Sequence, residues 1–119
     1  MCDSVPVHTV EFYQNKSGRE PVRDYYLGLS STAERLSIYG HILLLREFGW
    51  RLPQMGGQHA RLIDKESRIY ELRAGKHRIA YAQYQGRFVL LHAWRKSSQK
   101  LDIAEAHIAR NRLAAWLGR

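Results

Sequence analysis

Basic side chains gather where strand-like segments meet in the second half of the chain. Arg73 closes one such segment, Arg78 opens the next, and Arg95 and Lys96 follow the apolar run 88–94. A guanidinium group binds phosphate oxygens through paired hydrogen bonds, so clustered arginines are typical of a phosphodiester site. Each of these cations alone would be an ordinary solvated charge. Taken together they favour a site for a polyanion such as RNA.

Strand alternation indicates which of these side chains can meet. Glu71 and Arg73 share one face of their segment, and Arg78 faces the same way across a short turn. The small residues Ala80 and Ala82 would give this face a concave floor. The predicted cluster lies near His92 and Tyr81, of which Tyr81 is expected in the core, and consists of Arg73, Arg78, Arg95, Lys96 and Lys100.

His92 is the best candidate for acid–base chemistry, because an unperturbed histidine titrates near pH ~6.5. A structural histidine with satisfied hydrogen bonds is an equal alternative. Glu71 is a second candidate, although pairing with Arg73 would make it an ordinary salt-bridge acid. The RNA-binding surface would be completed by cations and one aromatic ring, namely Lys76, Trp94 and Lys100.

The net charge of +8 on 119 residues is unevenly distributed. Residues 1–60 hold six basic and six acidic residues, whereas residues 61–119 hold thirteen and five. This asymmetry points to a polyanionic partner for the second half, or simply to a basic surface. Cys2 is the only cysteine, and the six histidines are scattered, so neither a disulfide nor a metal site is expected. No cofactor motif, secretory signal or membrane span is recognisable, which favours a cytoplasmic protein.

The elements that position these residues follow from periodicity. Residues 7–13 are predicted to form a strand, a short helix starts at Pro21, and a capping box at 31–34 starts a longer helix that ends near Gly49. Residues 50–59 read as a loop. A four-stranded antiparallel meander follows, over 60–64, 68–73, 77–84 and 87–95, and a final helix starts at Asp102. We therefore expect one α+β domain over residues 1–119, with the helices on one sheet face and the other face open.

Three short motifs follow one another in this meander: Ile69-Tyr-Glu-Leu-Arg73, then Lys76-His-Arg-Ile-Ala-Tyr81, then Phe88-Val-Leu-Leu-His-Ala-Trp94 with the basic run to Lys100. In order and spacing they resemble the RelE/HigB/ParE toxin superfamily, most closely its phage-derived, HigB-like branch. The resemblance covers about residues 7–114 and agrees with the element order above.

The resemblance implies a toxin of a type II toxin–antitoxin system that cleaves mRNA, usually on the ribosome, without a metal or other cofactor. Arg78 matches the phosphate-binding arginine of the family, and Arg73 matches the arginine of its E-L-R strand. The basic pair after the last strand, the second basic position of that run, and the histidine before the aromatic residue are matched here by Arg95, Lys96, Lys100 and His92.

The implied partners are mRNA, the ribosome and an antitoxin, usually a small helix-turn-helix protein. Relatives often carry a tyrosine or histidine near the C-terminus as acid or base. This chain has no tyrosine after Trp94, and His107 lies within the final helix. The general base therefore stays open. Two alternatives remain, a ParE-like toxin that binds DNA gyrase without cleaving RNA, and an inactive prophage relic.

Overall fold

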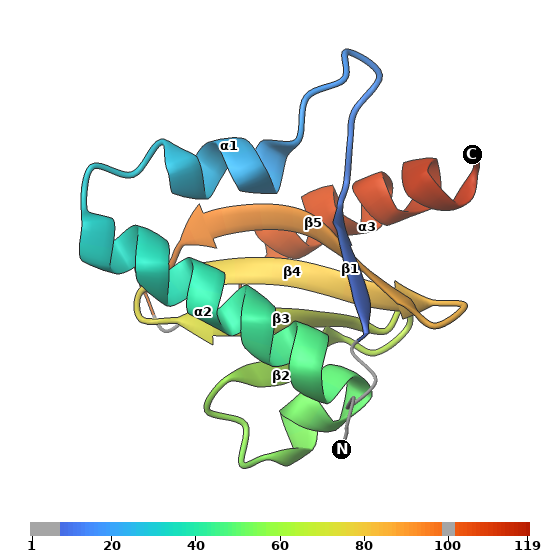
Figure 1. Cartoon of the computed structure of the whole chain (residues 1–119). Helices are drawn as coiled ribbons and strands as arrows, with labels where there is room; N and C mark the ends of the chain where they lie inside the picture. The colour runs from blue at the N-terminus through green and yellow to red at the C-terminus, as the bar shows by residue number, and fades with distance from the viewer. Residues whose placement is uncertain (1–7, 99–101) are drawn as a thin grey trace, which may run out of the picture.

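The computed structural model describes residues 8–98 and 102–119. Within these residues, three α-helices and a 3-10 turn surround a five-stranded sheet (Figure 1). In chain order the elements are β1 (Thr9–Phe12), α1 (Pro21–Leu27), α2 (Thr32–Phe48), the 3-10 turn η1 (Gly49–Gln54), β2 (Ala60–Asp64), β3 (Ile69–Ala74), β4 (His77–Tyr84), β5 (Arg87–Arg95) and α3 (Ile103–Leu117).

The sheet has the order β1-β5-β4-β3-β2. Strands β2 to β5 form the expected antiparallel meander, and its tight turns hold Gly75 and Gly86 at positive φ, a backbone conformation that glycine adopts without strain. Strand β1 lies parallel to β5 at one edge, with Thr9 opposite Arg87. The sheet is therefore mixed, and the α+β architecture is confirmed.

Helices α1 and α2 and the η1 turn cover one sheet face. Helix α2 begins where Ser31 Oγ accepts the Glu34 amide at 3.2 Å, as the capping box predicts. Its buried residues Ile38 and Leu45 belong to one apolar cluster with Leu72 and Ile79 of the sheet. Residues 50–59 were expected to be loop throughout, but η1 places Leu52 in this core.

Helix α3 packs against the opposite face, so the prediction of an open second face is wrong. Its buried residues Ala109 and Leu113 form a second cluster with Ala80, Ala82 and neighbouring apolar side chains. The two alanines therefore lie beneath a helix and do not form a concave floor. An amphipathic stripe must cover apolar surface somewhere, and small side chains in the sheet let a helix approach closely.

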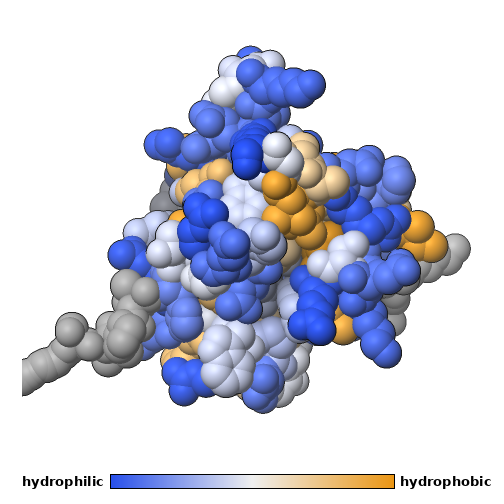
Figure 2. All heavy atoms as spheres, turned by 90° about the vertical axis from the view of Figure 1, so that its right-hand side faces the viewer, coloured by the Kyte–Doolittle hydropathy of each residue, from blue (hydrophilic) through white to orange (hydrophobic). Residues whose placement is uncertain are grey.

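Apolar side chains also reach the surface. Leu36, Tyr39 and Leu43 of α2 are exposed by 63%, 48% and 41%. Seen from the right-hand side of Figure 1, the molecule is mainly hydrophilic, with a short apolar strip between polar side chains (Figure 2). In the part of the chain that the structure describes, no helix has the length and hydrophobicity needed to span a bilayer.

Candidate phosphate-binding site

Three arginines surround one buried carboxylate on the α3 side of the sheet. Glu71 is 3% exposed, and its Oε2 lies 2.9 Å from Arg61 Nε and 3.8 Å from the Nε atoms of both Arg73 and Arg78. Strand register explains the meeting, because Arg61 pairs with Glu71 across β2 and β3, and Arg73 pairs with Arg78 across β3 and β4. This Glu71 cluster (Arg61, Glu71, Arg73 and Arg78) carries two positive charges in excess.

Backbone carbonyls fix two of these guanidinium groups. Arg73 Nη1 donates to the Gly57 carbonyl at 3.2 Å, and Arg78 Nη1 donates to the carbonyls of Gly75 and His77 at 2.7 and 3.0 Å. The buried Nε atoms of Arg73 and Arg78 have no hydrogen-bond partner among the described residues. Burial lowers the pKa of Arg78 while Glu71 opposes that shift, and an arginine stays cationic at neutral pH. The Nε atoms are closed to solvent, so an oxyanion would meet the cluster through its excess positive charge on the more exposed side chains of Arg61 and Arg73.

The start of α3 borders the Glu71 cluster. Asp102 Oδ2 accepts hydrogen bonds from Trp94 Nε1 at 2.7 Å and from Lys96 Nζ at 3.1 Å. Burial alone would raise the pKa of Asp102, but these two hydrogen bonds, together with the positive charges of Lys96 and Arg78, lower the pKa. One small cavity of about 10 Å³ is lined by Asp102, Trp94 and Lys96 and also by Arg61 and Glu71. Lys96 and Trp94 are therefore part of the same region.

His92 lies on the same face but is engaged by α3. Its Nε2 is 2.6 Å from Glu105 Oε1, and its Nδ1 accepts from Arg112 Nη1 at 3.2 Å. The ring also stacks on Trp94, with centroids 5.3 Å apart. Burial lowers the pKa of His92 despite the hydrogen bond to Glu105. This arrangement favours the neutral imidazole with its proton on Nε2.

Arg95 lies on the other face of the sheet, so the prediction that it meets Arg73 and Arg78 is wrong. Its Nη1 is 3.8 Å from Glu34 of α2. Side chains alternate along β5, and Arg95 therefore points opposite to Trp94 and Lys96. Lys76 lines the same pocket of about 360 Å³ as Arg95, on the α2 side. Both cations are thus separated from the Glu71 cluster by the sheet.

A buried histidine that the sequence did not single out organises this second region. His77 is 2% exposed, with Nδ1 2.8 Å from the Tyr25 hydroxyl and Nε2 2.5 Å from Glu34 Oε1. The hydrogen bond to His77 is the main cause that lowers the pKa of Glu34. We call Tyr25, Glu34, His77 and Arg95 the His77 cluster. It joins α1 and α2 to β4.

The structure thus brings together Arg73, Arg78, His92, Trp94 and Lys96 of the predicted site. Lys100 lies outside the described residues, and Tyr81 is a core residue, as expected. Arg61 was missed because a bulge between Leu62 and Asp64 shifts the register of β2 against β3, and the sequence gives no sign of that bulge. The α3 residues Asp102, Glu105 and Arg112 were missed because the sequence does not say which face α3 covers. Among the described residues, no three potential metal ligands of the His, Cys, Asp or Glu type lie together.

Comparison with known proteins gives one family. Residues 26–114, which are most of the chain, match the family described as phage derived protein Gp49-like. No curated protein matches the chain. The family is RelE- and HigB-like in general, and membership is compatible with a toxin of a toxin–antitoxin system. The chain belongs to the phage-derived Gp49-like family.

Proposed function

We propose that this protein is the toxin of a type II toxin–antitoxin system and acts as an mRNA interferase. The observation that carries the proposal is the Glu71 cluster, in which three arginines share one carboxylate and leave two positive charges in excess. The excess cations suit the phosphates of RNA.

The reaction would be metal-free cleavage through the ribose 2′-hydroxyl. The 2′-oxygen attacks the adjacent phosphorus, the bond to the 5′-oxygen breaks, and the products are a 2′,3′-cyclic phosphate and a 5′-hydroxyl. Arg73 and Arg78 would stabilise the charge that develops on the phosphorane, and Lys96 would assist. Preorganised donors of this kind commonly supply the largest part of catalysis.

Exposure separates the roles of the cations. The side chains of Arg61 and Arg73 are 49% and 31% exposed, whereas that of Arg78 is 10% exposed. The first two would meet the RNA backbone, and Arg78 would reach the reacting phosphate from below. Trp94 is 8% exposed and holds Asp102, so in this arrangement it positions its neighbours more than it offers a surface for stacking.

His92 remains the proposed proton-transfer residue, with a condition set by its contacts. Both ring nitrogens are engaged by α3, through Glu105 and Arg112. His92 can accept a proton from the 2′-hydroxyl only when one of these contacts is exchanged for substrate. Its lowered pKa keeps the imidazole neutral at physiological pH, which is the form a base requires.

The proposed partners are mRNA, the ribosome and a cognate helix-turn-helix antitoxin, in the cytoplasm. The same engagement of His92 favours the competing proposal, a ParE-like toxin that binds DNA gyrase without cleaving RNA. Primer extension on cellular mRNA after a pulse of expression separates the two. We expect discrete new 5′ ends bearing a 5′-hydroxyl within minutes. Growth arrest with induction of the DNA-damage response and intact mRNA would instead contradict the nuclease.

A further inference from the structure

Strand β1 leaves one of its edges open. Among the described residues it pairs with β5 alone. The Tyr13 amide donates to the Leu90 carbonyl at 2.9 Å, and amides alternate in direction along a strand, so those of Val10 and Phe12 point away from β5. Just before this strand, the His8 amide donates to the Arg46 carbonyl of α2 at 2.8 Å. An open strand edge is a template for another extended chain.

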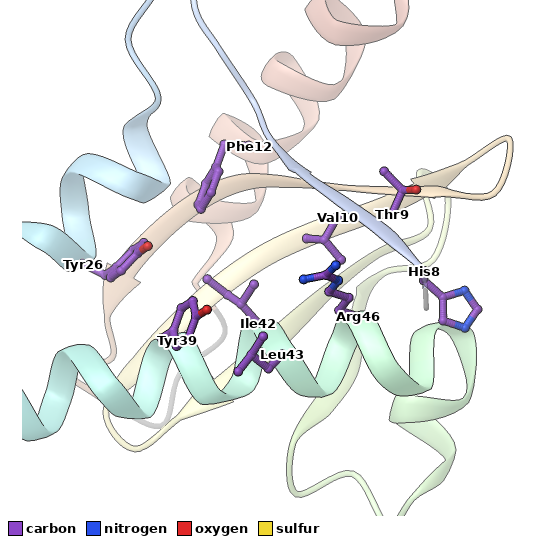
Figure 3. A pocket seen from close by; sticks show the side chains of 9 residues that line it. All are labelled: His8, Thr9, Val10, Phe12, Tyr26, Tyr39, Ile42, Leu43 and Arg46. Atoms are coloured by element: carbon purple, nitrogen blue, oxygen red, sulfur yellow. The ribbon is translucent and has the colours of Figure 1, made fainter. Parts of the chain in front are cut away.

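An apolar groove lies beside β1 on the α2 side. It has a volume of about 420 Å³, and Val10, Tyr26, Tyr39 and Ile42 converge on it from β1, α1 and α2 (Figure 3). Tyr39 and Leu43 are about half exposed at its rim. Exposed apolar side chains in a lined groove next to a strand edge mark a surface for apolar side chains of a partner.

A second groove lies beside β1 on the α3 side, and it is basic. Its volume is about 520 Å³, and its lining includes Arg87, Trp116 and Arg119. The Arg87 guanidinium lies 5.2 Å from the Trp116 ring, and those of Arg112 and Arg119 lie 5.7 and 5.2 Å from the Tyr13 ring. Glu11 is the one carboxylate side chain among the described residues that line this groove, and its Oε2 lies 3.3 Å from Arg87 Nη1. Arg112 and Arg119 add positive charge next to this pair. Cations therefore outnumber acids on this side of β1.

We propose that the β1 edge binds an extended segment of a partner protein in which apolar residues alternate with acidic ones. A strand paired with Val10 and Phe12 would direct every second side chain into the apolar groove and the others toward the basic groove. The side chains directed toward the basic groove should be acidic, because that groove is lined by arginines. The surface is separate from the Glu71 cluster, which lies on β2, β3 and β4, and the inference does not depend on RNA cleavage.

The alternative occupants predict different binding behaviour. Single-stranded RNA would use the arginines but would gain nothing from the apolar groove or the strand edge. A second copy of the chain would make the protein dimerise at micromolar concentration without any added peptide. An extended peptide needs all three features at once, namely the edge and both grooves.

The test uses a fluorescent nine-residue peptide in which leucine and glutamate alternate, with fluorescence anisotropy as the readout. Its controls are a peptide of the same composition in block order and an alternating peptide N-methylated at every second residue, which loses backbone donors. We expect the alternating peptide to bind at least tenfold more tightly than either control. Leu43→Ser and Arg87→Gln should each weaken binding at least fivefold, and Lys65→Ala, in the turn after β2, should not.

Equal binding of the three peptides would overturn the proposal. So would binding of a single-stranded oligonucleotide that competes with the peptide and is indifferent to Leu43→Ser, or sedimentation showing a dimer that Leu43→Ser dissociates while no peptide binds. The peptide assay is repeated with the Arg78→Ala variant, which changes the proposed RNA site and leaves the β1 edge intact. If this variant binds the peptide and the wild type cleaves no RNA, the proposed nuclease function fails and the β1-edge proposal stands.

Discussion

Two clusters of ionisable side chains flank the same end of the sheet, and they differ in how completely their members are satisfied. On the α3 side, Glu71 faces three arginines, and two of their Nε atoms have no hydrogen-bond partner within residues 8–98 and 102–119. On the α2 side, His77 has a partner on each ring nitrogen, and Glu34 balances Arg95. Neighbours in the chain, His77 and Arg78, therefore belong to different environments. The first cluster has capacity for an anion, whereas the second is internally satisfied and holds helices to the sheet.

This difference shows why basic residues that are close in sequence do not make one site. A single strand delivers its side chains to two faces, so the basic residues near the β3–β4 turn and the end of β5 divide between the two clusters. Substitutions on the two sides of the sheet should therefore have separable effects.

Removing the shared carboxylate should damage the Glu71 cluster most. Glu71→Ala leaves Arg61, Arg73 and Arg78 close together without their counter-ion. Losing one partner of a buried ion pair typically costs about 3–5 kcal/mol, and we expect a loss of that size in the free energy of unfolding, measured with urea. Glu71→Gln keeps the shape and should cost less. A loss below about 1 kcal/mol for the alanine variant would show that solvent already screens these charges.

His77→Ala should destabilise the protein by a smaller amount without affecting RNA cleavage. It removes two hydrogen bonds that join α1 and α2 to β4, and it leaves a cavity. Glu34 is half exposed and regains water, so the cost should be about 2–3 kcal/mol. Thermal unfolding and a cleavage assay below the transition check both parts. A folded variant that has lost cleavage would place catalysis on the α2 side.

His92 should make stability depend on pH in one direction. Burial lowers its pKa below the ordinary value of about 6.5, so the unfolded chain binds the proton more readily than the folded one. The stability that the neutral His92 ring contributes to the folded protein is therefore complete above pH ~6.5. It is lost as the pH falls through the pKa of His92 in the folded state.

Between pH 7 and pH 5, the free energy of unfolding measured with urea should fall less steeply for His92→Gln than for the wild type. Each histidine other than His92 is present in both proteins, so the difference between the two curves isolates this ring. An equal or steeper decline in the variant would mean that the folded state prefers the imidazolium.

Arg95→Ala should have the smallest effect. The Arg95 side chain is 58% exposed, and its contact with half-exposed Glu34 is 3.8 Å long. Such surface pairs contribute about 0–1 kcal/mol. Both the unfolding free energy and the RNA cleavage rate should stay close to those of the wild type. A strong loss of cleavage would restore Arg95 to the site in which the sequence placed it.

Much of the fold follows from the sequence, because local patterns specify strands and turns. The bounds of β2, β4 and β5 agree with the period-two segments, and the meeting of Glu71, Arg73 and Arg78 follows from alternation and one short turn. The parallel placement of β1 beside β5 does not follow, since element order says nothing of which edge a distant strand joins.

The remaining differences between the prediction and the structure concern tertiary packing. The apolar stripe of α3 indicates that a face is buried but not against which side of the sheet, so the partners of His92 were not predictable. Arg95 was assigned by its proximity to Lys96 in the chain, while alternation separates the two. His77 gave no signal as a lone histidine, because its partners Tyr25 and Glu34 come from two distant helices.

The most direct test compares Arg78→Ala with Arg95→Ala in a ribosome-containing translation reaction that reports mRNA cleavage. The two arginines lie on opposite faces at one end of the sheet, and circular dichroism with Arg78→Lys as a further variant controls for folding. We expect Arg78→Ala to lower the cleavage rate at least about 100-fold, as for loss of a transition-state donor, while Arg95→Ala stays near the wild-type rate. Cleavage at the wild-type rate by a folded Arg78→Ala protein would contradict this expectation.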